Sequence, residues 1–284
     1  MDQALSRGYL NEDFRMFHIR DKRDVSFDFH FHSFDKAIIF LSGSVTYYVE
    51  DKAYYLRPWD VLLVGHDQVH RPVIAPDEVY DRVIFYVNPA YLAREAPLTD
   101  MFERAAQTRY NIIRPDTRER LALSEMYVAL EGELKNPQFG TEALKGAIMT
   151  QIMITLNRVS LRGVVAGEKN YVADPKISEI VEYILQNLSG ELLIDKLAER
   201  FFVSPSFLMH RFREVTGYSP HNYITIKRMA QACELMLGGT SATDAARQCG
   251  YADYSSFSRA YRKQYGVSPT QPIPRMRGDD LPMD

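Results

Sequence analysis

Three histidines and one lysine in the first quarter of the chain are the residues whose types and spacing could bind a small ligand or a metal ion. His30 and His32 are separated by one residue, Lys36 follows four positions later, and His70 lies further along the chain. Three imidazoles could hold Zn²⁺ or Fe²⁺, whereas a protonated lysine cannot ligate a cation and repels one. The set is compatible with a metal site, with a polar pocket, or with purely structural histidines. We expect a polar pocket, with no metal and no cofactor.

The residues around the first two histidines alternate in type, which is typical of a strand. Within residues 27–32, phenylalanines alternate with Asp28, His30 and His32, and a period of two puts the two groups on opposite faces. If this strand is regular, Lys36 shares the face of the histidines. The cationic wall favours a carboxylate- or hydroxyl-rich metabolite, with an aromatic ring stacked on its apolar face. Candidates for that ring are Tyr47, Tyr55 and Trp59.

Short β-rich runs separated by turn signals continue through the first ninety residues. They are 37–41, 45–49, 53–56, 61–64 and 83–87. Many short antiparallel strands at close spacing predict a barrel or a sandwich.

From about residue 116 the apolar residues follow a helical period. The first apolar stripe consists of Leu123, Met126, Tyr127, Leu130 and Leu134. After a break at Asn136-Pro137, the second consists of Leu144, Ile148, Met149, Ile152, Leu156 and Val159. These stripes predict two helices that pack on the barrel and also pair with a second subunit, so we expect a homodimer.

The last third of the chain contains an internal repeat. Thr-Gly-Tyr-Ser-Pro at 216–220 returns 49 residues later as Tyr-Gly-Val-Ser-Pro at 265–269. Each copy follows a small-residue helix, a short turn and a second helix ending in glycine, which is the plan of a helix-turn-helix unit. A further helix from Ser219 to about Leu237 joins the units. It would span roughly 28 Å, close to the ~34 Å between successive major grooves on one face of DNA.

This region resembles the AraC/XylS family of bacterial transcription regulators over about a hundred residues. The resemblance rests on Leu197-Ala198, Ser204-Pro205, Leu208, Phe212, Gly217, Arg228-Met229, Ala232, Gly250-Tyr251, Phe257-Ser258-Arg259, Tyr261, Gly266 and Ser268-Pro269. Three positions depart from the family pattern. Leu193 replaces a capping Ser or Thr, Ala246 replaces a larger apolar residue, and residues 271–273 replace the usual ending with tyrosine and arginine. Because residues 271–273 depart from the family pattern, we make no prediction of a final helix.

The resemblance implies a set of DNA contacts. Bases would be approached by Ser206, Met209 and His210 in the first unit and by Tyr254, Ser255 and Arg259 in the second. Phosphates would be held by Arg213, Arg262 and Lys263. Arg259 is the strongest candidate for reading a guanine, because one guanidinium can bind O6 and N7 together.

The N-terminal histidines resemble the metal-binding motif of the cupin family. In that family a His-x-His pair, a glutamate four residues later and a distant histidine bind a metal, but here Lys36 occupies the glutamate position. Gly65 and Asp67 also stand where proline and glycine are usual. The resemblance implies a cupin-like barrel that senses a small-molecule effector. The alternative is a cupin-type metalloenzyme with an accessory helical domain, which Lys36 and the internal repeat disfavour.

Net charge does not identify a nucleic-acid binder. The chain carries −3 overall, and residues 171–284 hold 13 Lys and Arg against 13 Asp and Glu. The DNA interpretation therefore depends on where the basic residues fall. Cys233 and Cys249 are expected to be buried thiols in the reducing cytoplasm.

These patterns predict an α+β multidomain protein, a non-enzymatic, sequence-specific DNA-binding transcription regulator controlled by a small-molecule effector. The expected divisions are a cupin-like barrel at 1–114, a helical dimerisation pair at 115–161, a linker at 162–173, tandem helix-turn-helix units joined by a long helix at 174–274 and a disordered tail at 275–284. Expected partners are double-stranded DNA, the effector, a second copy of the chain and RNA polymerase, with no membrane.

Overall fold

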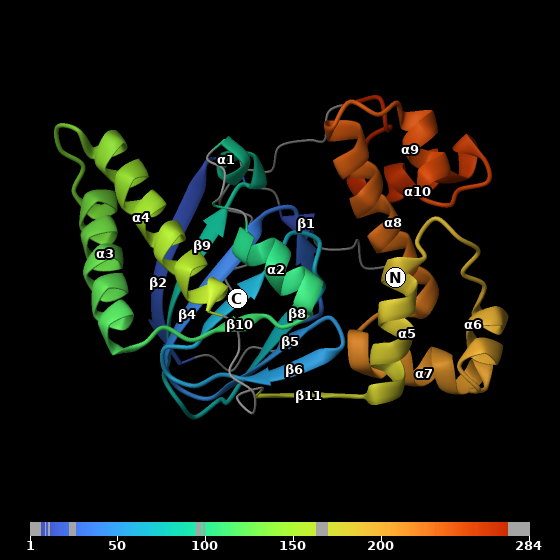
Figure 1. Ribbon diagram of the computed structural model, residues 1–284, viewed down its shortest axis with the longest axis horizontal. Helices are drawn as coiled ribbons and strands as arrows, with labels where there is room; N and C mark the ends of the chain where they lie inside the picture. The colour runs from blue at the N-terminus through green and yellow to red at the C-terminus, as the bar shows by residue number, and fades with distance from the viewer. Residues whose placement is uncertain are drawn as a thin grey trace.

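The computed structural model has antiparallel β-sheets in its N-terminal part and helices in its C-terminal part, which confirms the expected α+β class (Figure 1). The structure describes residues 7, 8, 10, 12–22, 27–94, 98, 100–162 and 170–271. The expected tail at 275–284, most of the expected linker and Pro272-Ile273 lie outside these residues.

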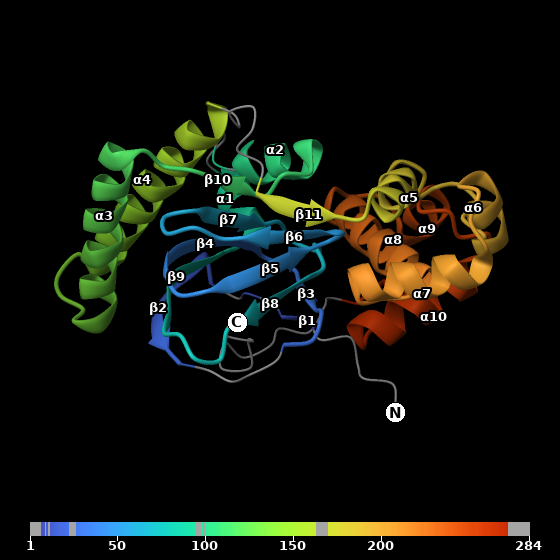
Figure 2. The same cartoon turned by 90° about the horizontal axis from the view of Figure 1, so that it is seen from below.

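Two sheets face each other in the N-terminal part, and we call this pair of sheets the barrel (Figure 2). The first has the order β10-β7-β4-β9-β2, with β10 at Ile112–Ile113, β7 at Val61–Val64, β4 at Asp35–Ser42, β9 at Tyr80–Val87 and β2 at Phe14–Asp21. The second has the order β11-β6-β5-β8, with β11 at Tyr171–Ala173, β6 at Lys52–Tyr55, β5 at Val45–Val49 and β8 at His70–Ile74. A short parallel pair joins β1, Arg7–Gly8, to β3, Phe31–His32.

Alternation along β4 explains how the two faces of its sheet are covered. Ile38 and Phe40 point between the two sheets, whereas Ala37 and Ile39 point outward. Four helices belong to the core on that outward side: α1, Pro89–Arg94; α2, Asp100–Thr108; α3, Thr117–Lys135; and α4, Thr141–Leu161. Because β4 is buried on both faces, its central residues 37–41 form a continuous apolar run.

The packing of α3 and α4 corrects the expected apolar stripes. Leu130 is fully buried against α4 and the sheet, as predicted, but Leu134 is 39% exposed and Leu144 is 46% exposed. Most residues of the two stripes, which we expected to contact a second subunit, are therefore buried within the chain. Leu134, Leu144 and exposed residues outside the two stripes remain accessible on this helix pair.

The end of the expected linker is ordered as part of the barrel. Residues 171–173 form β11, which pairs antiparallel with β6 and places Tyr171 opposite Tyr54. The linker therefore enters the C-terminal helices from a fixed point at the edge of the four-stranded sheet.

The C-terminal part consists of one leading helix, two short-helix-plus-long-helix pairs and a connector. The leading helix is α5, Pro175–Gln186. The first helix pair is α6, Ile194–Arg200, with α7, Pro205–Thr216, and the second helix pair is α9, Ala242–Gln248, with α10, Tyr254–Tyr265. The connector α8, Pro220–Leu237, lies between them.

The ends of α7 and α10 follow the repeat in the sequence. The Ser204 hydroxyl accepts a hydrogen bond from the backbone N–H of Phe207, and the Asp253 carboxylate accepts one from that of Ser256. Gly217 and Gly266 close the two helices with φ of 80° and 75°, a left-handed conformation that favours glycine. Leu193 stands at the N-cap of α6 without a side-chain capping bond.

Each helix pair has its own core against α8. Tyr223 and Ile226 of α8 are buried, but Leu237 is 89% exposed because the helix ends there. Among the described residues, no helix combines the length and apolar character needed to cross a membrane.

Candidate ligand pocket and nucleic-acid interface

The structure brings the four predicted pocket residues together inside the barrel. His30, His32, Lys36 and His70 are all buried. The ring centre of His70 lies 4.3 Å from that of His30 and 4.7 Å from that of His32. Reciprocal backbone hydrogen bonds between His30 and His70, of 3.0 and 2.8 Å, fix their separation.

Hydrogen bonds to the backbone define the tautomers of the three histidines. In each ring Nδ1 lies near a carbonyl oxygen two residues away: Asp28 for His30, Phe34 for His32 and Gln68 for His70, at 3.0, 2.6 and 2.9 Å. A carbonyl can only accept, so Nδ1 carries the proton in each case. In a neutral ring, Nε2 is then an acceptor.

Lys36 lies beside aromatic side chains. Its Nζ donates a 3.4 Å hydrogen bond to the Tyr47 hydroxyl and lies 5.4 Å from the ring centre of Tyr86. Of the three predicted stacking residues, Tyr47 belongs to the barrel core next to this cluster. Tyr55 is exposed, and Trp59 packs on the helix-covered side of the sheet, so the expectation for these two is wrong.

The expected regular strand over residues 27–32 is also wrong. Residues 27–29 belong to no strand, and His30 forms an isolated bridge before β3 begins at Phe31. The reason is the neighbouring helices: Phe29 contacts Gly217, and its carbonyl accepts a 2.8 Å hydrogen bond from the Tyr218 hydroxyl. Asp28 is exposed and does not join the buried wall.

Within the described residues, no group of three or more His, Cys, Asp or Glu side chains is arranged to hold a metal ion. Lys36 is connected to the histidine cluster through two tyrosines, since the Tyr47 ring lies 6.2 Å from that of His70 and the Tyr86 ring lies 6.3 Å from that of His32. Imidazoles with an ammonium nearby offer hydrogen-bond partners to an anionic or hydroxyl-bearing molecule.

All nine predicted DNA-contact residues lie on the solvent-exposed surface of α7 and α10. They are Ser206, Met209, His210, Arg213, Tyr254, Ser255, Arg259, Arg262 and Lys263. Their opposite helix faces carry the buried residues Leu208 and Phe212 in α7, and Phe257 and Tyr261 in α10. The core thus orients these polar faces outward.

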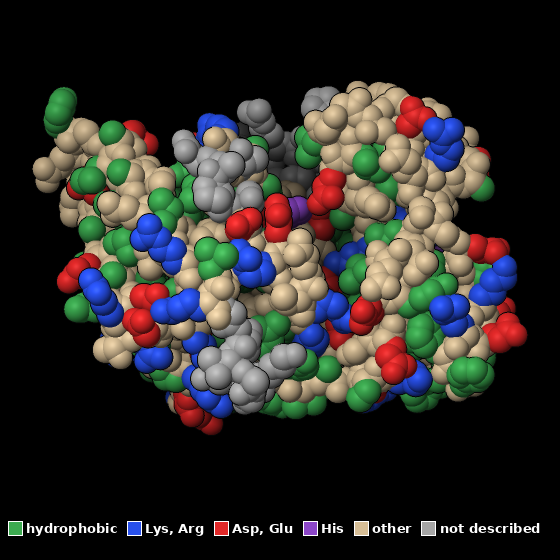
Figure 3. Space-filling model, in the orientation of Figure 1, with side chains coloured by type: hydrophobic (Ala, Val, Ile, Leu, Met, Phe, Trp, Pro, Cys, Tyr) green, Lys and Arg blue, Asp and Glu red, His purple; other side chains and the backbone are tan. Residues whose placement is uncertain are grey.

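The charges of the two exposed helix faces differ. Arg211 of α7 forms ion pairs with Asp174 and Glu214, at 2.6 and 2.7 Å, so it is held by acids of its own chain. The Arg259 guanidinium of α10 makes a 3.1 Å hydrogen bond to the Ser256 hydroxyl. Figure 3 shows both signs of charge interspersed over the face in view. Arg211 is therefore already held within the chain, whereas Arg213 of α7 and Arg262 and Lys263 of α10 lie on the exposed surface.

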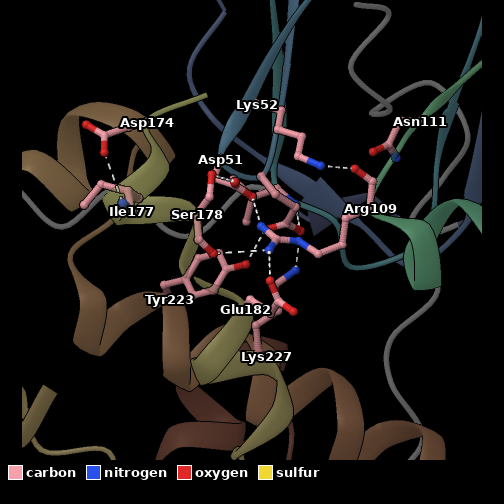
Figure 4. A network of polar contacts seen from close by, with 12 residues as sticks. Asp51, Lys52, Arg109, Asn111, Asp174, Ile177, Ser178, Glu182, Tyr223 and Lys227 are labelled. Carbon is pink, nitrogen blue, oxygen red and sulfur yellow. Dashed lines mark hydrogen bonds and ion pairs between the residues drawn. The ribbon is translucent and has the colours of Figure 1, made fainter. Parts of the chain in front are cut away.

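A polar interface joins the barrel to α5 and α8 (Figure 4). The β5–β6 turn, Glu50-Asp51, is buried there. Glu50 accepts hydrogen bonds of 2.5 Å from both the Lys227 ammonium and the Tyr223 hydroxyl. Burial and the adjacent Glu50 carboxylate raise the pKa of Tyr223 well above its usual value.

The second acid of the turn has partners on both sides. Asp51 accepts a 2.5 Å hydrogen bond from the Ser178 hydroxyl of α5 and forms an ion pair with Arg109. Arg109 also donates to the Ser178 carbonyl and lies 3.4 Å from Glu182. A cavity of ≈ 170 Å³ adjoins this network and is lined in part by Glu50 and Arg109.

His66 forms a separate bridge between the two parts. Its Nδ1 lies 2.8 Å from the Asp35 carboxylate, and its Nε2 lies 3.1 Å from Glu234 of α8. Burial by itself lowers the pKa of His66, but the hydrogen bonds to Asp35 and Glu234 outweigh it and raise the pKa to about 11. The ring is therefore protonated at neutral pH in this arrangement.

Sequence reasoning missed the interface residues. One signal was present: two acids form a two-residue hairpin turn where Asn-Gly or Asp-Gly is usual. Lys227 was not identifiable, because a lysine beside a buried stripe is normally solvated.

Two family models match the chain: an AraC-like ligand binding domain at residues 16–152 and a helix-turn-helix domain at residues 197–272. The HTH-type transcriptional activator RhaS of Escherichia fergusonii is 21% identical over 248 residues, 87% of either chain. The probable transcriptional regulator LumQ of Photobacterium leiognathi is 25% identical over 250 residues, 87% of this chain and 92% of LumQ. Among solved structures, the C-terminal domain of AraT, a response regulator from Geobacillus stearothermophilus, is 32% identical over 34% of this chain and 81% of that one, with a TM-score of 0.33.

The chain belongs to the AraC family of transcription regulators. This AraC-family protein is a DNA-binding transcription regulator with an N-terminal ligand-binding domain, as expected from its sequence. The individual contacts to ligand and DNA stay predictions.

Proposed function

We propose that this AraC-family regulator senses a carboxylate- or hydroxyl-rich metabolite with His30, His32, Lys36 and His70, and binds promoter DNA as a homodimer through α7 and α10. The corresponding divisions are residues 1–114 for sensing, 115–161 for dimerisation, 162–173 as connection and 174–274 for DNA, with two helix-turn-helix units joined by α8.

The burial of Lys36 beside Tyr47 and Tyr86, whose rings lie near His70 and His32, is the observation that carries the ligand proposal. Its side chain is fully buried, and taking an ammonium out of water costs free energy that polar partners must offset. The 3.4 Å contact to Tyr47 is a long hydrogen bond. A carboxylate in the same space would add an opposite charge and a strong, charge-assisted hydrogen bond.

The ligand proposal is tested by thermal unfolding of the full-length protein with a panel of small carboxylates and sugars. A ligand that binds only the folded state raises the free energy of unfolding, by about 2.7 kcal/mol at 100 times its Kd, and the unfolding temperature rises with it. At least one compound should stabilise the wild type and not Lys36→Met. The control is Lys196→Met, because the Lys196 ammonium is exposed on α6, where it pairs with Glu191.

Two outcomes would contradict this proposal. One is a wild-type protein that no compound of either class stabilises. The other is stoichiometric zinc or iron that is lost in His70→Ala, which would establish a metal site in place of a metabolite pocket.

The DNA proposal is supported by the exposed helix faces and the length of α8. Its 18 residues span about 27 Å, comparable with the ~34 Å between successive major grooves. Binding of the full-length protein to its own promoter should weaken with salt by roughly 0.9 log unit per log unit of salt for each phosphate contact. Binding without a salt slope would contradict the proposal.

The dimer proposal is supported by apolar side chains that α3 leaves exposed. Leu121 and Val128 are 63% and 55% exposed and lie two helical turns apart on one face. The double variant Leu121→Glu, Val128→Glu should sediment as a monomer, whereas Leu237→Glu, on α8, should not change the oligomeric state. A wild-type monomer at micromolar concentration, with and without DNA, would refute the dimer. RNA polymerase is a further partner that we expect at the promoter.

A further inference from the structure

Arg82 of β9 carries a guanidinium into the apolar interior of the barrel. It has the same parity on the strand as Ile84 and Tyr86, which point between the two sheets. It lies opposite Phe40 of β4 and Ile19 of β2, which belong to the same inner face. Its side chain is fully buried, and it is the only buried arginine among the residues that the structure describes. An ionised group in an apolar core must be compensated by polar partners.

Arg82 and the predicted pocket lie at different ends of the barrel. Tyr86, four residues further along β9, pairs with Lys36 of β4. A strand rises about 3.3 Å per residue, so about 13 Å of strand separates the two positions. Ile38 and Ile84, both fully buried, lie on the inner face between them. The inner wall therefore has a cation near each end and an apolar stretch in the middle.

The contacts of the Arg82 guanidinium use one terminal nitrogen and one face. Nη1 donates hydrogen bonds to the Asp21 carboxylate, at 2.5 Å, and to the Tyr80 carbonyl oxygen, at 3.1 Å. The central carbon of the guanidinium lies 4.2 Å from the ring centre of Tyr80, a cation–π contact. These contacts hold the group in place without using Nε or Nη2.

The remaining edge of the guanidinium consists of Nε and Nη2, and both atoms are buried. Among the described residues, neither atom has a hydrogen-bond acceptor. Their two N–H bonds are parallel and match the two oxygens of a carboxylate, so this edge can bind a carboxylate in a bidentate way. Buried donors without an acceptor cost free energy, and a bound carboxylate would recover it.

The surroundings of Arg82 favour a small, singly charged anion. The Asp21 side chain, which contacts the guanidinium, is 24% exposed, and Ile19 and Ile74 at this end of the barrel are only partly buried. The guanidinium is therefore one side chain away from water. Asp21 also places a negative charge beside the site, so a doubly charged phosphate would be repelled more strongly than a carboxylate.

We propose that Arg82 is a second anion-binding site of the barrel and that its Nε–Nη2 edge binds the carboxylate group of a small molecule. The inference rests on the proposed sensing function only for the identity of the natural ligand. That ligand is a carboxylic acid held by Arg82, at the other end of the barrel from Lys36.

The test uses acetate as the probe and the full-length protein labelled with nitrogen-15. The Nε–H resonance of Arg82 is identified by its loss in Arg82→Lys. Acetate should shift this resonance with half-saturation on the order of 1–10 mM, the affinity that a good ligand of about four non-hydrogen atoms reaches. Chloride at the same ionic strength should not shift it, because a single atom cannot accept two parallel N–H bonds.

Three variants separate anion binding from a purely structural ion pair. Asp21→Asn removes the like charge beside the site, so the half-saturating acetate concentration should fall on the order of three- to tenfold. Arg82→Lys keeps the positive charge but loses the parallel N–H bonds, so acetate should raise its unfolding temperature less than that of wild type. The matched control is Arg114→Lys, because Arg114 also pairs with a buried carboxylate, Asp60, at 2.8 Å. Acetate should stabilise this control as much as wild type.

Two results at Arg82 itself would overturn the proposal. One is a resonance that acetate leaves unshifted, or that chloride shifts equally. The other is weaker acetate binding in Asp21→Asn, which would show that the pair with Asp21 only holds the barrel together. Neither measurement needs DNA or the natural ligand. A failed metabolite screen at Lys36 therefore leaves this result standing, and an inert Arg82 does not contradict a Lys36-dependent ligand.

Discussion

The two helix pairs repeat one sequence pattern, yet the barrel packs against the first of them. Gly217 and Gly266 occupy the same place in the repeat and have nearly the same φ. A Cβ added at Gly217 would lie 2.2 Å from the Phe29 ring, whereas one added at Gly266 would meet no heavy atom within 4 Å. Both positions favour glycine because of their left-handed backbone, but at Gly217 the Phe29 ring also leaves no room for a side chain.

The cores of the two pairs differ in the same way. Val69 of the barrel belongs to the core of the first pair, whereas the buried members of the second core all come from residues 229–265. Local sequence thus specifies two similar helix pairs, and the tertiary contacts give them different roles. The first is positioned by the barrel, and the second is positioned through α8.

The largest expected difference between the pairs concerns the two glycines. Gly266→Ala should lower the free energy of unfolding by about 1–2 kcal/mol, the cost of a left-handed conformation. Gly217→Ala should lower it by about 2–5 kcal/mol, because overpacking against Phe29 adds roughly 1–3 kcal/mol. Urea unfolding of the full-length variants measures both. Phe29→Ala in the Gly217→Ala background should recover part of the difference, and equal losses in the two glycine variants would contradict the comparison.

The next largest effect concerns the residues at matched positions on α7 and α10. Arg259 and His210 are 49 residues apart, the repeat distance, but only a guanidinium can bind guanine at two atoms. Arg259→Ala should cost ~1–3 kcal/mol at one or two base pairs, and His210→Ala about 0.5–1.5 kcal/mol. Binding to a randomised operator library measures both.

A phosphate contact provides the control for this measurement. Arg262→Ala should weaken all sequences alike and reduce the salt slope by about 0.9. If Arg259→Ala and Arg262→Ala changed the library profile in the same way, the division between base reading and phosphate binding would be wrong.

The smallest expected effect distinguishes the N-caps of α7 and α10. Ser204→Ala should cost about 1 kcal/mol at every pH, because a hydroxyl does not titrate in this range. Hydrogen bonds from the backbone and side chain of Ser256 hold the pKa of Asp253 below its ordinary value of 3.8. Its contribution is therefore fully present above pH 3.8 and is lost as the pH falls through the lowered value. Urea titrations from pH 7 to 3 should show this loss in wild type and not in Asp253→Asn.

Local patterns predicted the helices of the C-terminal part well. Gly217 and Gly266 end their helices in the structure, as the repeat predicted, and Ser204 and Asp253 begin them, which are residue types favoured at N-caps. Caps and apolar periods depend on residues within a few positions of each other, so a single sequence contains the necessary information. The clustering of His30, His32, Lys36 and His70 was predicted for a similar reason, although the regular strand used to argue it was wrong.

Contacts between distant segments could not be predicted in this way. The partners Glu50 and Lys227 are separated by 177 positions, and nothing in either neighbourhood marks one for the other. The displacement of Phe29 from a regular strand, and the use of the α3 stripe within the chain, likewise depend on what packs against them. Whether an apolar or charged side chain meets solvent, a sheet or another domain is a property of the assembled fold.

The sequence by itself determined a sheet-rich sensing part, two similar DNA-binding helix pairs and the residues that each presents, because short-range periodicity and capping chemistry specify these features. The tertiary structure decided that the barrel packs against the first of those pairs, and that the barrel residues Phe29 and Val69, which face that pair, alternate with the pocket residues His30 and His70 along the same backbone. Long-range docking decides this, because side chains that alternate along a strand acquire their roles only when both faces of the sheet are covered.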